Sequence, residues 1–314
     1  MSYQGRVQSA REAILQTVAY FDAIDYAPTW TECASWFEWS GAHGFEYDAP
    51  PTVPELVSAR DGLVHDGRLE SGFGRIALHG RLARLALLAM ERTALFPRKV
   101  RRARSVARWL LRNPNVRYVA LANTTALAHA RDLGDLDFFV VVRAGTIWSS
   151  RLLGSGVYKL LGRLPGHTDK QDAVCLSYFV ADDALDLSSH MLPGDDPYFR
   201  YWFLSLLPLA DDGVGKSLWD ANRALISRHP RAERWMLTPD LTVTRPRIRC
   251  IASDAIESLA RRFQLGWFPK QIVERMNRDT SVMVNDHVLK FHVDDGREAY
   301  RAAYQERLRV MGLV

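Results

Sequence analysis

Apolar side chains recur at helical spacing near the start of the chain. The recurring positions are Ile14, Leu15, Val18, Ala19 and Phe21. Because positions three and four apart share one face of a helix, this spacing predicts an amphipathic helix over residues 8–24. A cap at Thr29 or Thr31 would begin a second helix that runs through Phe37. A third helix is expected from near Thr52 to about His65.

Two short extended stretches around a glycine-containing turn follow in DGRLESGFGRIALHG, residues 66–80. Three helices and then a β-ribbon are the element order of a winged helix, which reads DNA by placing its third helix in the major groove. Here that helix offers Arg60 as its cation and also carries Glu55 and Asp61. Because this charge pattern suits phosphate poorly, we favour a structural or dimerising role over DNA binding.

Residues 80–113 are rich in Leu, Ala and Arg, which predicts helix, with Pro97 breaking or kinking it into two. The second half is strongly basic, with Arg98, Lys99, Arg101, Arg102, Arg104 and Arg108. We interpret this run as a solvated helix face. The alternative is a basic wall that attracts a nucleoside triphosphate or RNA toward neighbouring carboxylates.

The pattern changes from helix to strand in VRYVALANTTALAHARDLGDLDFFVVVR, residues 116–143. VRYVALA has the composition of a strand, and a short helix is expected at 126–130 after a polar turn. A second strand from Leu136 to Val142 is almost continuously apolar, as expected when both faces of a strand are covered. Asp135 and Asp137 stand two residues apart at its start, so their carboxylates point to one face.

Two carboxylates at this spacing suit Mg²⁺, which is commonly held by one or two carboxylates together with substrate phosphates. The turn Asn123-Thr124-Thr125 precedes a helix N-terminus, where backbone N–H groups and hydroxyls can hold those phosphates. We therefore expect a metal at Asp135 and Asp137 and phosphate at the turn. The alternative is an ordinary turn and a solvent-facing strand end, because Asp-x-Asp is frequent by chance.

The remaining chain alternates between helix and strand. We expect a helix from 147 to about 164, a strand at 173–180, a short acidic helix at 181–190, an irregular aromatic segment from Pro197, a strand or turn at 206–210 and a helix from Gly215 or Lys216 to Ser227. Few helix signals occur at 230–249. Further expectations are a helix capped by Ser253 to about Phe263, a helix at 269–276, a short strand near Leu289 and a closing helix at 297–311.

The central stretch resembles the minimal nucleotidyltransferase core of the DNA polymerase beta superfamily, whose pattern is strand, Gly-Ser or Gly-Gly, short helix and Asp-hydrophobic-Asp. GDLDFFVVV carries the second half of this pattern. The segments AYFD…DY, VVVRAGTIW, DAVCLSYFVADDALDL and LKFH are similar to a bacterial group in which a winged helix precedes this core.

The resemblance implies an α+β protein with a winged-helix-like domain at 1–80, a mixed-sheet nucleotidyltransferase core at 81–212 and a mostly helical C-terminal domain at 213–314. It also implies Mg²⁺-dependent transfer of a nucleoside monophosphate from an NTP to an unknown acceptor, which can be a small molecule, RNA or protein. Asp135 and Asp137 would be the catalytic metal ligands, and Asn123, Thr124 and Thr125 would bind the nucleotide.

Two departures from the family pattern bear on activity. Asn123 and Thr124 stand where the family has Gly and Ser. Asn tolerates left-handed backbone and Thr keeps a hydroxyl, but a side chain can obstruct a phosphate that Gly admits. The third carboxylate has its nearest candidate in Asp172. These departures leave open a catalytically degenerate fold that acts as a nucleotide- or nucleic-acid-binding regulator or scaffold.

Composition narrows the class of protein. With 47% hydrophobic and 25% charged residues in 314, disorder is disfavoured, and no membrane-length apolar run or signal-peptide-like start occurs, so we expect a cytoplasmic protein without a membrane partner. Cys33, Cys175 and Cys250 form no C-x-x-C pair, which favours reduced thiols over a zinc site. A net charge of +5 is compatible with a phosphate-bearing partner but modest for a dedicated nucleic-acid binder.

Overall fold

A six-stranded mixed sheet lies at the centre of the computed structural model, which describes residues 3–39, 49–160, 171–244 and 253–313. The strand order is β6-β3-β4-β5-β8-β7. Only β4 and β5 are parallel among these neighbours. The strands are β3 (Val116–Leu121), β4 (Leu136–Val142), β5 (Val174–Ala181), β6 (Leu207–Asp211), β7 (Val282–Val284) and β8 (Val288–Phe291). The expected α+β class with a mixed sheet is confirmed.

Both faces of β4 are covered, which explains its almost continuous apolar sequence. Phe139 and Val141 pack into a cluster with aromatic side chains of α7 (Pro197–Leu204). Phe138 and Val140 pack on the other face against α4 (Leu82–Leu110) and α6 (Ile147–Leu160). The helix expected at 147–164 is α6, which confirms the prediction as far as residue 160. The last four expected positions lie outside the described residues.

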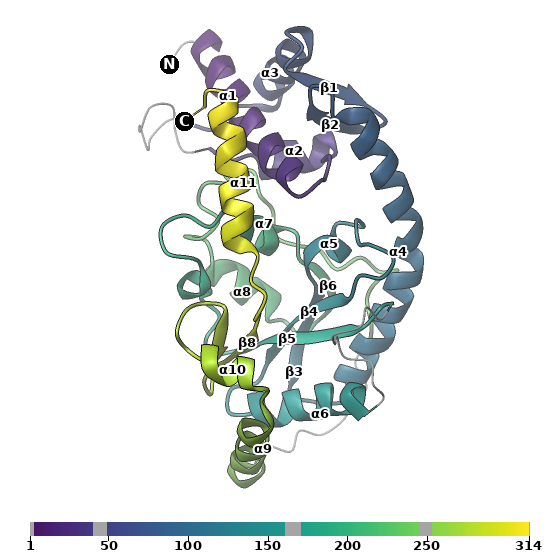
Figure 1. Cartoon of the computed structure of the whole chain (residues 1–314), viewed down its shortest axis with the longest axis vertical. Coiled ribbons are helices and arrows are strands. Elements are labelled where there is room, and N and C mark those ends of the chain that lie inside the picture. The colour runs from purple at the N-terminus through teal and green to yellow at the C-terminus, as the bar shows by residue number, and fades with distance from the viewer. Residues whose placement is uncertain (1–2, 40–48, 161–170, 245–252, 314) are drawn as a thin grey trace.

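The N-terminal segment folds as three helices and a hairpin, as expected. These elements are α1 (Tyr3–Ala23), α2 (Trp30–Trp36), α3 (Val53–His65), β1 (Leu69–Gly72) and β2 (Arg75–Leu78), the last two paired antiparallel. Thr29 caps α2 through its side chain, and the backbone N–H of Thr52 donates to Glu55 at the start of α3. Figure 1 shows this segment at one end of the molecule, with the sheet toward the other end.

The prediction that Pro97 divides residues 80–113 into two helices is wrong, because α4 is one continuous helix. Its first half packs against the β1–β2 hairpin and its second half against β3 and β6, so α4 connects the two ends of the molecule (Figure 1). This packing outweighs the hydrogen bond that proline removes. The solvated-face interpretation of the basic run is also wrong at Lys99, which is 1% exposed.

The chain after β5 differs from expectation at several points. Residues 197–204, expected to be irregular, form α7 because Pro197 suits a first helical position and Asp196 accepts a hydrogen bond from the N–H of Phe199. The acidic helix expected at 181–190 reduces to a 3-10 turn at Ser188–His190. The helix expected to reach residue 227 is α8 (Gly215–Ala221), and β7 was not anticipated.

The C-terminal segment closes the molecule. It contains α9 (Asp254–Trp267), α10 (Lys270–Arg275), the two strands β7 and β8 and α11 (Arg297–Val310). The helix α11 runs back along α1, so both chain termini lie at the same end (Figure 1). The buried carboxylate of Asp22 accepts from Arg81 and Arg307, each at 2.7 Å. This bridge ties α1 to α4 and α11.

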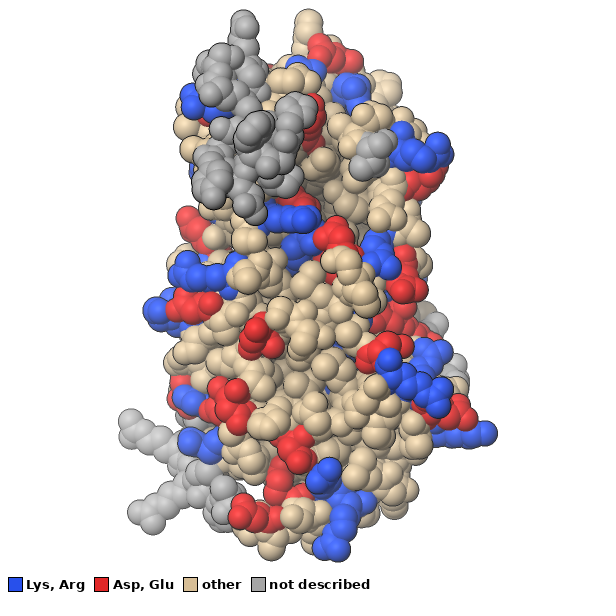
Figure 2. Space-filling view, turned by 90° about the vertical axis from the view of Figure 1, so that its left-hand side faces the viewer, with Lys and Arg blue, Asp and Glu red and all other residues tan. Residues whose placement is uncertain are grey.

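Charged side chains are distributed without a dominant sign on the face in Figure 2, where acidic and basic groups are interspersed. Cys33 and Cys175 are free thiols, as expected, whereas Cys250 lies outside the described residues. None of the helices in the described ranges is both long and apolar enough to cross a membrane.

Candidate functional site

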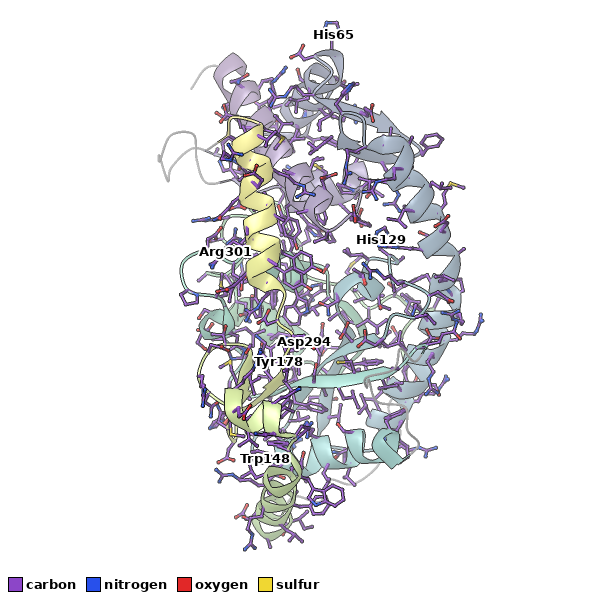
Figure 3. The ribbon with its side chains drawn as sticks, in the orientation of Figure 1. His65, His129, Trp148, Tyr178, Asp294 and Arg301 are labelled. Carbon is purple, nitrogen blue, oxygen red and sulfur yellow. The ribbon has the colours of Figure 1, made fainter. Side chains whose placement is uncertain are left out.

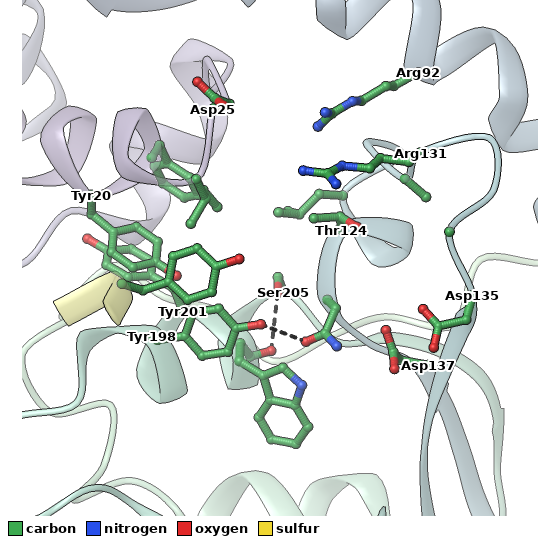
Figure 4. A pocket seen from close by; sticks show the side chains of 18 residues that line it. Tyr20, Asp25, Arg92, Thr124, Arg131, Asp135, Asp137, Tyr198, Tyr201 and Ser205 are labelled. Carbon is green, nitrogen blue, oxygen red and sulfur yellow. Dashed lines mark hydrogen bonds between the residues drawn. The ribbon is translucent and has the colours of Figure 1, made fainter. Parts of the chain in front are cut away.

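A cavity of about 360 Å³ lies where the N-terminal helices meet the start of β4 (Figure 4). Its walls come from α1, α4, the short helix α5 (Asn123–Ala126), the loop before β4, α7 and α11. This volume falls within the range of small-molecule sites. The cavity therefore joins segments from the beginning, middle and end of the chain.

Four of the five expected site residues line this cavity: Asn123, Thr124, Asp135 and Asp137. The fifth, Thr125, is 1% exposed and donates its hydroxyl to the backbone carbonyl of Asp135 at 3.4 Å. Thr125 therefore holds the loop that carries Asp135 instead of facing the cavity.

The two aspartates form a crowded pair. Burial and the charge of the neighbouring Asp135 together raise the pKa of Asp137 to about 6. Burial also raises the pKa of Asp135. Cations relieve such repulsion between carboxylates. Two carboxylates fit a Mg²⁺ ion that keeps substrate phosphates and water as its other ligands.

Cys175 is a potential third ligand that the sequence did not reveal. It lies beside Asp137 in the register of β4 and β5, and its sulfur and the two carboxylates offer ligand atoms within 4.8 Å of one another. Sulfur is a soft donor that suits Zn²⁺ better than Mg²⁺. Sequence patterns did not reveal Cys175, because it approaches the aspartates through the pairing of β4 with β5, which the sequence of neither strand shows by itself.

Asp172 does not take the position of a third carboxylate. Its side chain forms salt bridges with Lys99 at 2.9 Å and Arg98 at 3.1 Å, and it does not line the cavity. Asp172 instead anchors α4 to the turn that begins β5. The suggestion that it completes the metal site is therefore not supported by its position.

Asn123 has a left-handed backbone conformation, with φ at 55°. Its side-chain oxygen accepts a hydrogen bond from Tyr198 at 3.0 Å. Its amide group also hydrogen-bonds Asp137 and thereby lowers the pKa that burial raises. Asn123 thus adopts the left-handed backbone conformation that Asn was expected to tolerate, and its side chain orients Asp137.

Two arginines supply positive charge to the same cavity. Arg92 extends from α4 and Arg131 from the loop after α5, and Figure 4 shows both near Thr124. Burial and the charge of Arg131 lower the pKa of Arg92. Within the described ranges neither side chain forms a salt bridge. Local sequence patterns did not predict this pair, because Arg92 and Arg131 are far apart in the sequence.

The opposite wall is aromatic, with Tyr20, Tyr198, Tyr201 and Tyr300 among its side chains. His129 lies between the N-terminal helices and α4 (Figure 3). Its Nε2 atom lies 2.9 Å from the Asp25 carbonyl oxygen, and burial lowers its pKa to about 4. His129 therefore helps to join the N-terminal segment to the site loop.

Comparisons with known protein families, with characterised proteins and with solved structures find no match to this chain. The chemistry of the site is accordingly inferred from its own residues.

Proposed function

We propose that the cavity binds a divalent-metal complex of a nucleoside triphosphate and transfers the nucleoside monophosphate to an acceptor. The separation of charge within one cavity carries this proposal: Asp135 and Asp137 form no salt bridge at one side, and Arg92 and Arg131 form none at another. This holds among the residues described. A metal–triphosphate complex matches this arrangement, because its cation meets the carboxylates and its phosphate oxygens meet the guanidinium groups.

Each group has a defined part in this proposal. Asp135 and Asp137 hold the metal, which neutralises charge that develops on the phosphates. Arg92, Arg131 and Thr124 bind the β and γ phosphates. The acceptor oxygen bonds to the α-phosphorus, the bond from that phosphorus to the bridging oxygen breaks, and pyrophosphate leaves. The acceptor proton passes to water.

The test measures nucleotide binding and pyrophosphate release with each of the four NTPs, with and without Mg²⁺ or Mn²⁺. Asp137→Ala and the isosteric Asp137→Asn are expected to abolish metal-dependent binding and release. The matched control is Asp132→Asn, because Asp132 is an exposed aspartate five residues away that does not line the cavity. Absence of both binding and turnover in the wild type would refute the proposal.

A second candidate is a nucleotide-binding regulator without transferase activity. The Asn123 side chain occupies the place of a glycine beside Asp137, and a thiol stands where a third carboxylate would complete a two-metal site. Both features favour binding over turnover. Metal-dependent nucleotide binding without pyrophosphate release, at saturating concentrations of varied acceptors, would support this alternative.

The order and pairing of α1, α2, α3, β1 and β2 support a winged-helix-like module, but its third helix is poorly arranged for DNA. Arg60 lies over the Trp30 ring at 4.7 Å and bonds to Asp61 at 2.7 Å, so its charge is already engaged. We propose instead that this module forms a wall of the substrate cavity, through Tyr20 and its neighbours on α1.

A further inference from the structure

The aromatic wall of the cavity combines three tyrosines from distant parts of the chain. Tyr20 belongs to α1, Tyr198 to α7 and Tyr300 to α11. In Figure 4 Tyr20 and Tyr198 lie across the cavity from Asp135 and Asp137. This side of the cavity is therefore rich in ring surface and carries Asp25 at its edge, in contrast to the carboxylate and guanidinium sides.

Tyr198 and Tyr300 form a stacked pair, with ring centroids 5.2 Å apart and planes 14° from parallel. Tyr300 lines the cavity and is 39% exposed, so part of its ring surface stays accessible. Planar rings with an accessible face offer the stacking surface that nucleobases use in proteins.

Tyr20 presents a polar group to the same space. It is 3% exposed and its ring stacks on Tyr201 with centroids 4.0 Å apart, but its hydroxyl has no hydrogen-bond partner among the described residues. The neighbouring phenols are bonded, because Tyr198 donates to Asn123 and Tyr201 donates to Thr17. Burial raises the pKa of the Tyr20 phenol, and the neighbouring Tyr198 raises it further.

We propose that the tyrosine wall is the nucleoside subsite of the cavity, where Tyr198 and Tyr300 stack against the base and the Tyr20 hydroxyl bonds its polar edge. This inference rests on the proposed nucleotide site. A metal complex of a nucleoside triphosphate has three chemically distinct parts, which are the cation, the phosphates and the nucleoside. The cavity has three matching walls, which are the carboxylate, guanidinium and aromatic sides. The metal-bound phosphates occupy the charged sides, which leaves the aromatic side for the nucleoside. The N-terminal module then contributes directly to nucleotide selection.

The experiment compares two probes, an NTP and inorganic tripolyphosphate, each titrated with Mn²⁺ present and measured by calorimetry. Tripolyphosphate keeps the charge and metal affinity of the NTP tail but has no nucleoside. Tyr300→Ala removes the accessible ring, and Tyr20→Phe removes only a hydroxyl. Phe73→Ala is the matched control, because Phe73 is an exposed aromatic residue on the β1–β2 turn that does not line the cavity.

Tyr300→Ala is expected to weaken NTP binding roughly tenfold, by the usual loss of base stacking, and to leave tripolyphosphate binding unchanged. Tyr20→Phe should alter the ranking of the four NTPs, with tripolyphosphate again unaffected. Equal weakening of both probes would overturn the inference, since the tyrosines would then only support the fold. Unchanged NTP affinity, with a raised KM for an acceptor, would also overturn it and assign the wall to the acceptor. If the wild type binds neither probe, the proposed function itself fails.

Discussion

Lys99 links the long helix α4 to the loop that carries the proposed metal ligand Asp135, and its replacement provides a quantitative test of that linkage. Its ammonium group donates to the carbonyl of Gly134 at 2.6 Å, to the carbonyl of Asp132 at 3.3 Å and to Asp172 at 2.9 Å. The residue is 1% exposed. Lys99→Met keeps the aliphatic length but removes the charge and all three hydrogen bonds.

The magnitude follows from these contacts. Breaking a buried ion pair by removing one partner costs about 3–5 kcal/mol, because the other charge stays buried. Asp172 is 13% exposed and keeps Arg98 at 3.1 Å, which offsets part of this cost. The two carbonyls each lose a donor, at about 1 kcal/mol each. We therefore expect a loss of about 3 kcal/mol, which lowers the unfolding midpoint of this 314-residue chain by about 5 °C.

Thermal unfolding followed by tryptophan fluorescence measures this shift. The matched control is Arg98→Met, which removes the other cation from Asp172 but is 34% exposed and should cost less than about 1 kcal/mol. Since Gly134 directly precedes Asp135, Lys99→Met should also weaken metal binding. If Lys99→Met unfolds within 2 °C of the wild type, or no lower than Arg98→Met, the buried linkage is not as described.

Three further predictions test other parts of the account. Burial lowers the pKa of Lys290 to about 7, so above that pH the unfolded chain binds more protons than the folded chain. The free energy of unfolding should therefore rise between pH 7 and 8.5, and it should rise less in Lys290→Met. Urea titrations that give the same pH dependence for both proteins would contradict this. Cys175→Ser should abolish the ultraviolet thiolate–metal absorption that Cd²⁺ produces in the wild type, whereas Cys33→Ser should keep it; a persistent band in Cys175→Ser would exclude that thiol as a ligand. Arg131→Gln should weaken NTP and tripolyphosphate roughly tenfold alike, and a loss confined to the NTP would place Arg131 at the nucleoside instead.

The two strands β3 and β4 were predictable because their signals are local, whereas the short helix expected at 126–130 is wrong and lies at Asn123–Ala126. The alternation of side chains along a strand places Asp135 and Asp137 on one face. The apolar run of β4 indicates that both faces of this strand are covered. The caps of α2 and α3 were readable for the same reason, since Thr29 and Thr52 act within one turn. Local chemistry thus indicated the part of the cavity that lies within residues 116–143.

The rest of the cavity depends on packing between distant segments. Arg92 reaches it from α4, and Tyr300 reaches it because α11 returns along α1. Cys175 joins the aspartates through the register of two strands that are separated by a helix in the sequence. No single stretch of sequence carries these relationships, so the charge complementarity and the aromatic wall emerge only in three dimensions.

The most direct test of the central claim is a crystal structure with Mn²⁺ and a non-hydrolysable NTP analogue, in which anomalous scattering locates the metal. The account predicts Mn²⁺ bound by the carboxylates of Asp135 and Asp137, with the triphosphate extending to Arg92 and Arg131. A nucleotide bound elsewhere, or in this cavity without metal at the two aspartates, would contradict it.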